Sequence, residues 1–247
     1  MDWRDEGILI AVRRHGESAA IVEVLTRDHG RHAGVVRGGG SRRMAPVLQP
    51  GAHLAVEWSA RLEEHMGHFR IDPIRTHAAV LMGDRAALAT LGAMAAMIAA
   101  TLPEREAHPK LYARSLDLLE ALGRTGDWGA RYAVWELALL AELGFGLDLE
   151  RCAVTGEGED LVWVSPKSGR AVSRTAGGPW AERLLVLPAF LRAGWEVPPP
   201  AAEVRAALAL SGHFLDARVA PTLPRGTLPE ARARAVEAIL RAAPGEV

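Results

Sequence analysis

The sequence predicts an α+β protein, with a small N-terminal β-barrel followed by an α-helical region that carries an inserted β-hairpin. Three observations predict this class. Short alternating segments separated by turn residues fill roughly the first 75 residues. From residue 80 onward the chain becomes rich in Ala, Leu and Met without alternation, which is typical of helix. Between residues 150 and 178 the helical pattern is interrupted.

The N-terminal region reads as a run of short strands with turns such as Pro50-Gly51 between them. The predicted strands cover residues 6–14, 19–26, 31–37, 52–59 and 65–71. Five strands in about 75 residues is the size of an OB-fold barrel. An SH3-like barrel fits the same pattern and stays open as an alternative. We expect residues 1–78 to form this barrel domain.

The helical domain is expected over residues 79–247. Pro103 ends its first helix, Pro109 suits the first turn of the second, and Asp127 caps the third. The predicted helices cover residues 80–102, 109–122, 128–143, 180–193 (interrupted at Pro188), 201–215 and 229–242. Within residues 150–178, the segments 161–164 and 170–173 flank a Pro/Gly loop and predict a β-hairpin.

Composition limits the classes of protein to consider. The chain has 247 residues, a formal net charge of -1 and one cysteine, so an internal disulfide framework is excluded. The first residues are acidic and no apolar signal segment follows them. The most apolar window, residues 88–102, is too short to span a bilayer. We therefore expect a cytoplasmic protein with no membrane partner.

Positive charge is concentrated between residues 27 and 51. This stretch holds five arginines and one acidic residue, a local net charge of +4. Glycines at 38–40 allow close approach of a ligand, and guanidinium groups suit phosphates. The stretch predicts a site that binds a nucleic-acid backbone. A loop that is merely solvated is equally compatible with this charge pattern. The predicted contacts are Arg27, Arg31, Arg37, Ser41, Arg42 and Arg43.

Catalytic patterns are missing from the sequence. It contains no G-x-S-x-G, no P-loop and no H-E-x-x-H motif. We therefore expect no enzyme activity and no cofactor. Trp58 and Phe69 offer aromatic rings for base stacking, but core packing is the favoured interpretation for both.

Four groups of residues, in this order, resemble the bacterial RecO family of recombination mediators. They are Gly7-Ile8-Leu9 with Gly16-Glu17-Ser18, Leu25-Thr26 and His29-Gly30-Arg31; the arginine-rich loop before Leu48-Gln49-Pro50; Trp135 to Leu140 running into Leu143-Gly144-Phe145-Gly146; and Cys152-Ala153 followed by Val164 to Gly169. The ordered set covers residues 7 to about 191.

The resemblance implies an N-terminal OB-fold and a helical C-terminal domain. It also implies binding to single- and double-stranded DNA and annealing of complementary strands. The implied partners are RecR and the acidic tail of single-stranded DNA-binding protein (SSB), with RecA loaded as the indirect outcome. A protein with these partners is expected in the cytoplasm, at the nucleoid.

Two departures from the family pattern matter. Many members carry a four-cysteine zinc site in the hairpin region, but here the corresponding pairs are Cys152/Thr155 and Ser173/Ala176. One thiol cannot build a structural zinc site, so we expect no metal and a hairpin held by its own packing. Relatives also often have an arginine where this chain has Val134. We therefore expect Arg131 and Trp135 to take part in binding the acidic tail.

A competing interpretation is a protein-interaction adaptor whose barrel does not bind nucleic acid. Its functional surface would be the helical domain around Arg131 and Trp135, and the arginine-rich loop would only be solvated. Variants of the arginine-rich loop separate the two interpretations.

Overall fold

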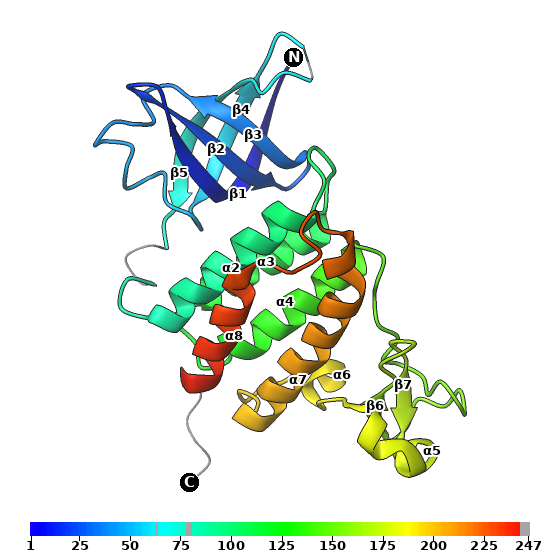
Figure 1. Cartoon of the computed structure of the whole chain (residues 1–247). Coiled ribbons are helices and arrows are strands. Elements are labelled where there is room, and N and C mark those ends of the chain that lie inside the picture. Colours follow the sequence, from blue (N-terminus) through cyan, green and yellow to red (C-terminus); the bar gives the residue numbers. More distant parts are fainter. Residues whose placement is uncertain (63, 78–80, 243–247) are drawn as a thin grey trace. The chain divides into compact units, whose positions relative to one another are not determined.

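The computed structural model describes residues 1–62, 64–77 and 81–242. Its contacts divide the chain into two compact units. Unit 1 is Met1–Arg124 with Pro229–Ala235, and unit 2 is Thr125–Leu228 with Val236–Val247. Figure 1 shows the order of the elements along the chain. The expected domain boundary after residue 78 stays a prediction.

Unit 1 begins with a closed five-stranded barrel in the order β1-β2-β3-β5-β4, which confirms the predicted α+β class and barrel. The strands are β1 (Asp2–His15), β2 (Ala19–Thr26), β3 (Gly30–Val36), β4 (His53–Ser59) and β5 (His68–Arg75). Alternate residues of β3 and β4 are buried, as the period of two predicts. The interior is filled by aliphatic side chains and by Trp58 and Phe69.

β1 is longer than predicted and pairs with two neighbouring strands. Its first half pairs with β4, from Asp2 opposite Ser59 to Ile8 opposite His53. Its second half pairs with β2 up to His15 opposite Ala19, with an irregularity between Leu9 and Ala11. Such a bulge bends a strand, and the bend lets β1 leave one neighbour for the other.

The barrel closes weakly between β3 and β5. Within the described chain these strands share one paired position, Val35 opposite His68, in parallel orientation. Val35 also donates its backbone N–H to Gly67 O at 3.1 Å. Position 34, beside this seam, requires a glycine because a Cβ there would stand 2.5 Å from the ring of Phe69.

Unit 1 continues into helices α2 (Arg85–Thr101) and α3 (Pro109–Ala121). Asp84 caps α2 by accepting from the backbone N–H groups of Ala86 and Ala87. The helix predicted from residue 80 therefore begins later, and residue 80 itself lies outside the described residues. Pro109 occupies the first turn of α3, as predicted.

Unit 2 contains α4 (Trp128–Glu142) and α7 (Ala201–Phe214), which pack on each other. A short bond from Ser211 Oγ to the buried carboxylate of Glu136, at 2.5 Å, joins them. α7 runs into the turns η2 (Leu215–Val219) and η3 (Ala220–Thr222), and α8 (Glu230–Ala242) ends the described chain. Among the described residues, no helix is long and apolar enough to cross a membrane.

The predicted hairpin is part of a three-stranded sheet with the order β7-β6-β8. Its strands are β6 (Leu161–Val164), β7 (Ala171–Ser173) and β8 (Leu185–Val186). The helix predicted over residues 180–193 is therefore wrong. The segment holds α5 (Arg174–Gly177), the 3-10 turn η1 (Gly178–Arg183), strand β8 and the single turn α6 (Phe190–Ala193). β8 pairs with β6, and Pro188 prevents a helix from running through to α6.

The residues around Cys152 do not fit a zinc site. Cys152 is fully buried, and its Sγ accepts the backbone N–H of Ser173 at 3.3 Å. Ser173 Oγ in turn accepts the N–H of Ala176 at 3.4 Å. One thiol is too few for a tetrahedral structural site. Among the described residues no group of three or more His, Cys, Asp or Glu is placed to hold a metal.

Candidate nucleic-acid interface

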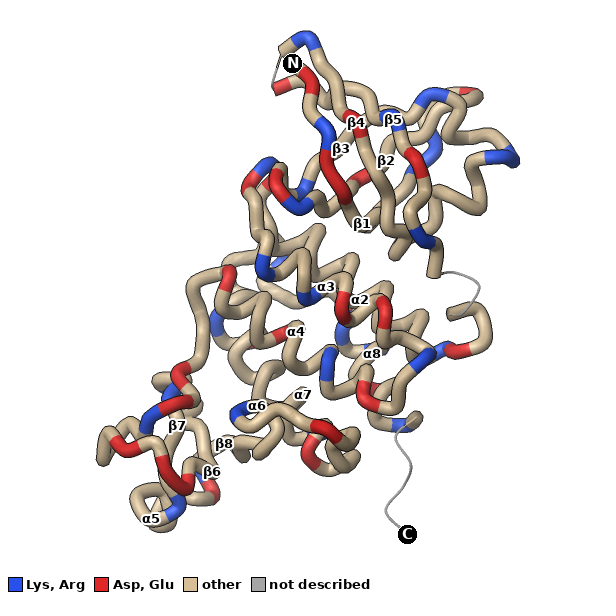
Figure 2. Tube along the Cα trace, turned by 180° about the vertical axis from the view of Figure 1, so that it is seen from behind, with Lys and Arg blue, Asp and Glu red and all other residues tan. Residues whose placement is uncertain are grey.

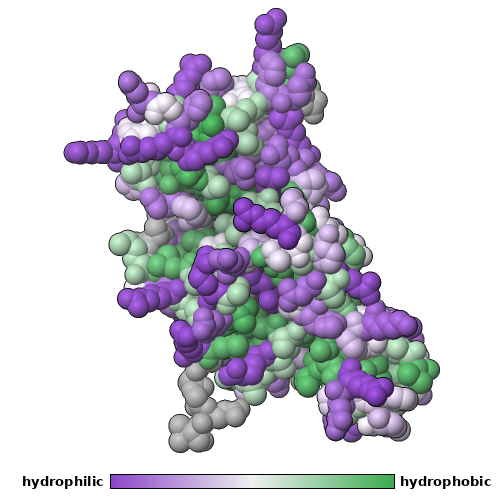
Figure 3. Space-filling view, viewed as in Figure 1, coloured by the Kyte–Doolittle hydropathy of each residue, from purple (hydrophilic) through white to green (hydrophobic). Residues whose placement is uncertain are grey.

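The loop between β3 and β4 presents unpaired arginines. Arg37, Arg42 and Arg43 are exposed, and no ion pair involves them in the part of the chain that the structure describes. The loop is held by its apolar residues, because Leu48 is buried and Met44 packs against the barrel core. Anchored in this way, the arginines project outward, and Figure 3 shows long hydrophilic side chains standing out from the barrel.

The turn between β1 and β2 lies beside this loop. Gly40 donates its backbone N–H to Ser18 O at 3.0 Å. The turn follows Arg13 and Arg14, which are exposed and pair across the strands with Ile21 and Ala20. We call Arg13, Arg14, Arg37, Arg42 and Arg43 the basic end of the barrel. Figure 2 shows positively charged positions along these loops.

Sequence reasoning missed Arg13 and Arg14 as site residues. They were assigned to the end of a strand, and strand spacing alone does not show that the β1–β2 turn meets the β3–β4 loop. The available signal was the adjacent arginine pair followed by the Gly16 turn, which places two charges at a strand end. Ser41, a predicted contact, is exposed within the same loop.

Arg27 belongs to the β2–β3 turn rather than to the basic end. It is exposed and forms an ion pair with the neighbouring Asp28 at 2.8 Å. Its charge is therefore largely balanced, and strand β3 separates it from the loop that holds Arg42.

Arg31 is placed inside unit 1. Its side chain is 13% exposed and lies 3.2 Å from Glu23 and 3.7 Å from Glu104. Its Nε also donates to Leu102 O at 3.1 Å. Close by, Gly30 has a φ of +68°, and a Cβ there would stand 1.9 Å from the carbonyl oxygen of Glu106. Arg31 thus fastens the barrel to the segment after α2 and does not face solvent as a DNA contact.

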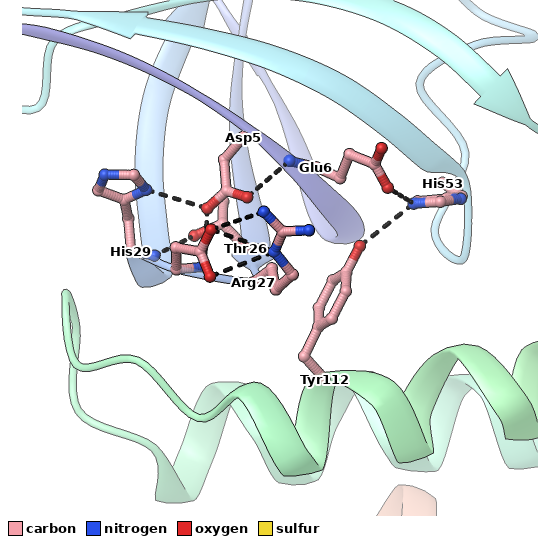
Figure 4. Close-up of polar contacts among 8 residues, drawn as sticks. Asp5, Glu6, Thr26, Arg27, His29, His53 and Tyr112 are labelled. Atoms are coloured by element: carbon pink, nitrogen blue, oxygen red, sulfur yellow. Dashed lines mark hydrogen bonds and ion pairs between the residues drawn. The ribbon is translucent and has the colours of Figure 1, made fainter.

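A polar network lies at the end of the barrel next to α3 (Figure 4). The buried carboxylate of Asp5 lies 2.9 Å from His29 Nδ1 and accepts the backbone N–H groups of Glu6 and Asp28. His53 Nε2 lies 3.2 Å from Glu6 and 3.1 Å from the hydroxyl of Tyr112 on α3. Burial, together with the charges of Glu6 and Asp5, raises the pKa of Tyr112. This network is structural.

A cleft of about 590 Å³ opens on the barrel and is lined by the start of β1, the end of β3, the end of β4 and the start of β5. Trp58 and Phe69 lie at its base and are 2% and 4% exposed, so the prediction that they pack in the core is confirmed. Trp3 is partly buried and stacks on His29 and Trp58, with ring centroids 4.0 and 5.6 Å apart. Arg37 and Arg70 reach the rim of the cleft.

In unit 2, Trp135 is 1% exposed and stacks on Tyr132, so it is a core residue and no surface contact. Arg131 is partly exposed, pairs with Asp127 at 2.9 Å and lies over the ring of Trp195. Burial alone would raise the pKa of Asp127, but hydrogen bonds from Arg131, Thr125 and Trp195 outweigh it and lower that pKa to about 2. The structure therefore does not bring Arg131 and Trp135 together on a surface.

Comparison with known proteins identifies the family. Residues 1–76 match the model "Recombination protein O N terminal", and residues 82–226 match "Recombination protein O C terminal". A "DNA repair protein RecO" of Cereibacter sphaeroides is 59% identical over 98% of this chain and 100% of its own length. Proteins of the same name from Roseobacter denitrificans and Ruegeria sp. are 54% and 52% identical, over 98% of this chain and 99% of theirs. The chain belongs to the RecO family of DNA repair and recombination proteins.

Proposed function

We propose that this chain binds single- and double-stranded DNA through the basic end of its barrel and anneals complementary strands. The observation that carries the proposal is the exposed, unpaired set Arg37, Arg42 and Arg43, beside Arg13 and Arg14. Arginines that neutralise phosphates release counterions, which favours binding without regard to sequence. Two strands held near one surface have their charges screened and their bases left free to pair.

The proposal places the basic end, rather than all five arginines of the stretch 27–51, along the DNA path. Arg31 is withdrawn from the DNA contacts because its guanidinium is engaged by Glu23 and Leu102 inside unit 1. Arg27 is a minor contact at most, since Asp28 balances its charge. Ser41 remains a proposed hydroxyl donor.

The salt dependence of binding to labelled single-stranded DNA tests this site. If about four phosphates are neutralised, log K falls against log salt with a slope on the order of -3. Removing two of these contacts in Arg42→Ala/Arg43→Ala reduces the slope to about -1.5 and weakens all sequences alike. Arg61→Ala/Arg85→Ala is the matched control, because these arginines are exposed, lie outside the basic end and remove the same charge.

Family membership supports a wider role, in which the protein acts with RecR to load RecA onto DNA coated by SSB. It acts without bond-making residues, and we infer a cytoplasmic, nucleoid-associated location. Arg131 remains the proposed contact for the acidic tail of SSB, whereas Trp135 is buried and is not proposed to touch the tail. An Arg131→Ala variant is expected to bind a peptide of that tail more weakly than an Arg205→Ala variant does.

The adaptor interpretation makes the opposite prediction for these experiments. A parent protein without measurable DNA binding at low salt, combined with normal capture of the tail peptide, would replace the proposal with the adaptor. Equal slopes for the parent and Arg42→Ala/Arg43→Ala would instead keep DNA binding and remove the basic end as its site.

A further inference from the structure

The cleft on the barrel lies where its closure is weakest. β3 and β5 share the single pair Val35 and His68 in the described chain. Beyond that pair the strands part, with Val36 and Arg37 on one lip and residues 68–71 on the other. A continuous ladder between β3 and β5 would close this side of the cleft, and residues 2–4 of β1 and 57–59 of β4 line the rest of it.

The cleft has an apolar base and a cationic rim. Its base is made by side chains that also belong to the barrel core, which are Val36, Met44, Trp58, Phe69 and Ile71. Its rim carries Arg37 and Arg70, both exposed, on opposite lips. The acidic residue opposite Arg70, Glu57, is already paired with Arg4 at 2.7 Å. Asp2 also lines the cleft, so the charged residues at the rim are three arginines (Arg4, Arg37 and Arg70) and two acids (Asp2 and Glu57), a net charge of +1.

We propose that this cleft holds one nucleotide of a single DNA strand, with its base on the apolar floor and its flanking phosphates on Arg37 and Arg70. This inference rests on the proposed DNA binding and adds a second, strand-selective contact to it. The volume of about 590 Å³ lies within the range of small-ligand sites. Arg37 belongs to both the basic end and the rim, so a strand on the basic end leads into the cleft.

The geometry favours a single strand over a duplex. A paired base is stacked between its neighbours and must leave the helix before it enters a cleft, which costs free energy. An unpaired base enters without that cost and gains contact with apolar and aromatic groups. Trp3 also lines the cleft, and His29 and Trp58 stack on its ring. One anchored base leaves its neighbours free to pair, which is compatible with annealing.

Two variants change the cleft without touching the basic loop. Ser59 is exposed at the end of β4 and lines the cleft, so Ser59→Trp fills it with a residue that strands accept. Arg70→Ala removes one rim charge, and Arg61→Ala is its control because Arg61 is exposed and does not line the cleft. The full-length variants are compared for binding to labelled oligo-dT and to a duplex of equal length, at one salt concentration.

Ser59→Trp, which blocks the base, and Arg70→Ala, which removes a phosphate contact, are each expected to weaken oligo-dT binding by about tenfold, with Arg61→Ala unchanged. Duplex binding by Ser59→Trp stays at the parent value. Unchanged oligo-dT binding in both variants, or an equal loss for oligo-dT and duplex in Ser59→Trp, overturns the inference. Thymidine monophosphate that binds the parent as tightly as oligo-dT also overturns it, because the cleft is then a site for free nucleotides.

The two proposals fail in different ways. A parent that binds neither DNA form ends both of them. A parent whose binding depends on Arg42 and Arg43 but not on Ser59 or Arg70 keeps the proposed function and loses only the cleft.

Discussion

His32 makes the barrel sensitive to acid. It is 4% exposed, and neither of its ring nitrogens has a hydrogen-bond partner among the described residues. The rings of Trp3, Trp58 and Phe69 surround it, the nearest centroid being that of Trp58 at 4.7 Å. Burial, with smaller contributions from the charges of Arg105 and His29, lowers the pKa of His32 from 6.5 to about 4.

The sign and size of the effect follow from proton linkage. The unfolded chain binds a proton at pH values below about 6.5, whereas the folded chain does so only below about 4. The stabilising contribution of neutral His32 is therefore complete above pH 6.5 and is lost as the pH falls toward 4. The loss amounts to about 2 kcal/mol at pH 5 and about 3 kcal/mol at pH 4.

Urea unfolding between pH 8 and pH 4 compares the parent with His32→Leu, which cannot take up a proton. At pH 8 the variant loses aromatic edge contacts worth about 1 kcal/mol but breaks no hydrogen bond. That cost does not vary with pH. Between pH 8 and pH 5 the free energy of unfolding of the variant therefore rises by about 2 kcal/mol relative to that of the parent. His15→Leu, at an exposed histidine, controls for the substitution. Equal acid sensitivity of the parent and His32→Leu, or an NMR titration of the ring near 6.5, refutes the reasoning.

Three further predictions concern residues that stabilise the interior of one unit or the other. Arg31→Ala is expected to lower the free energy of unfolding by about 3 kcal/mol, because it leaves Glu23 and the carbonyl oxygen of Leu102 without their partner. The DNA affinity of the folded protein is expected to stay unchanged. A selective loss of DNA binding would return Arg31 to the interface. Asp127→Ala is expected to cost about 2 kcal/mol at pH 7, and the difference from the parent shrinks as the pH falls from 3.8 toward 2, since the depressed pKa of Asp127 stabilises the fold only above that range. Chelator treatment is expected to leave the Tm unchanged, because Cys152 is held by Ser173 and not by zinc; a lower Tm, or stoichiometric zinc in purified protein, contradicts this.

Much of the fold was predictable because its signals are local. Strand alternation, Pro109 at a helix start and the Pro50-Gly51 turn each act within a few residues, and the corresponding elements are present. The helix prediction for residues 180–193 failed because the structure there depends on a contact that is distant in sequence. β8 has two residues and exists through its pairing with β6, which sequence periodicity does not reveal.

The candidate site was predicted in part for the same reason. A charge count finds Arg37, Arg42 and Arg43, since the loop is local. The count does not show that Arg31 faces Glu23 and Glu104, because the second partner comes from the segment after α2. It also misses Arg13 and Arg14, which join the basic end through the contact between two loops.

The double pairing of β1 has a consequence for the order in which the barrel assembles. The second half of β1 pairs with β2, and β2 with β3, through short turns, so this meander closes from contacts that are near in sequence. The first half waits for β4, and Asp2 meets its partner only at Ser59. Loop closure over such a distance is slow compared with hairpin formation. During synthesis the first residues of the chain thus find their partner strand only once β4 has emerged, and until then Trp3 can meet His29 but lacks the ring of Trp58.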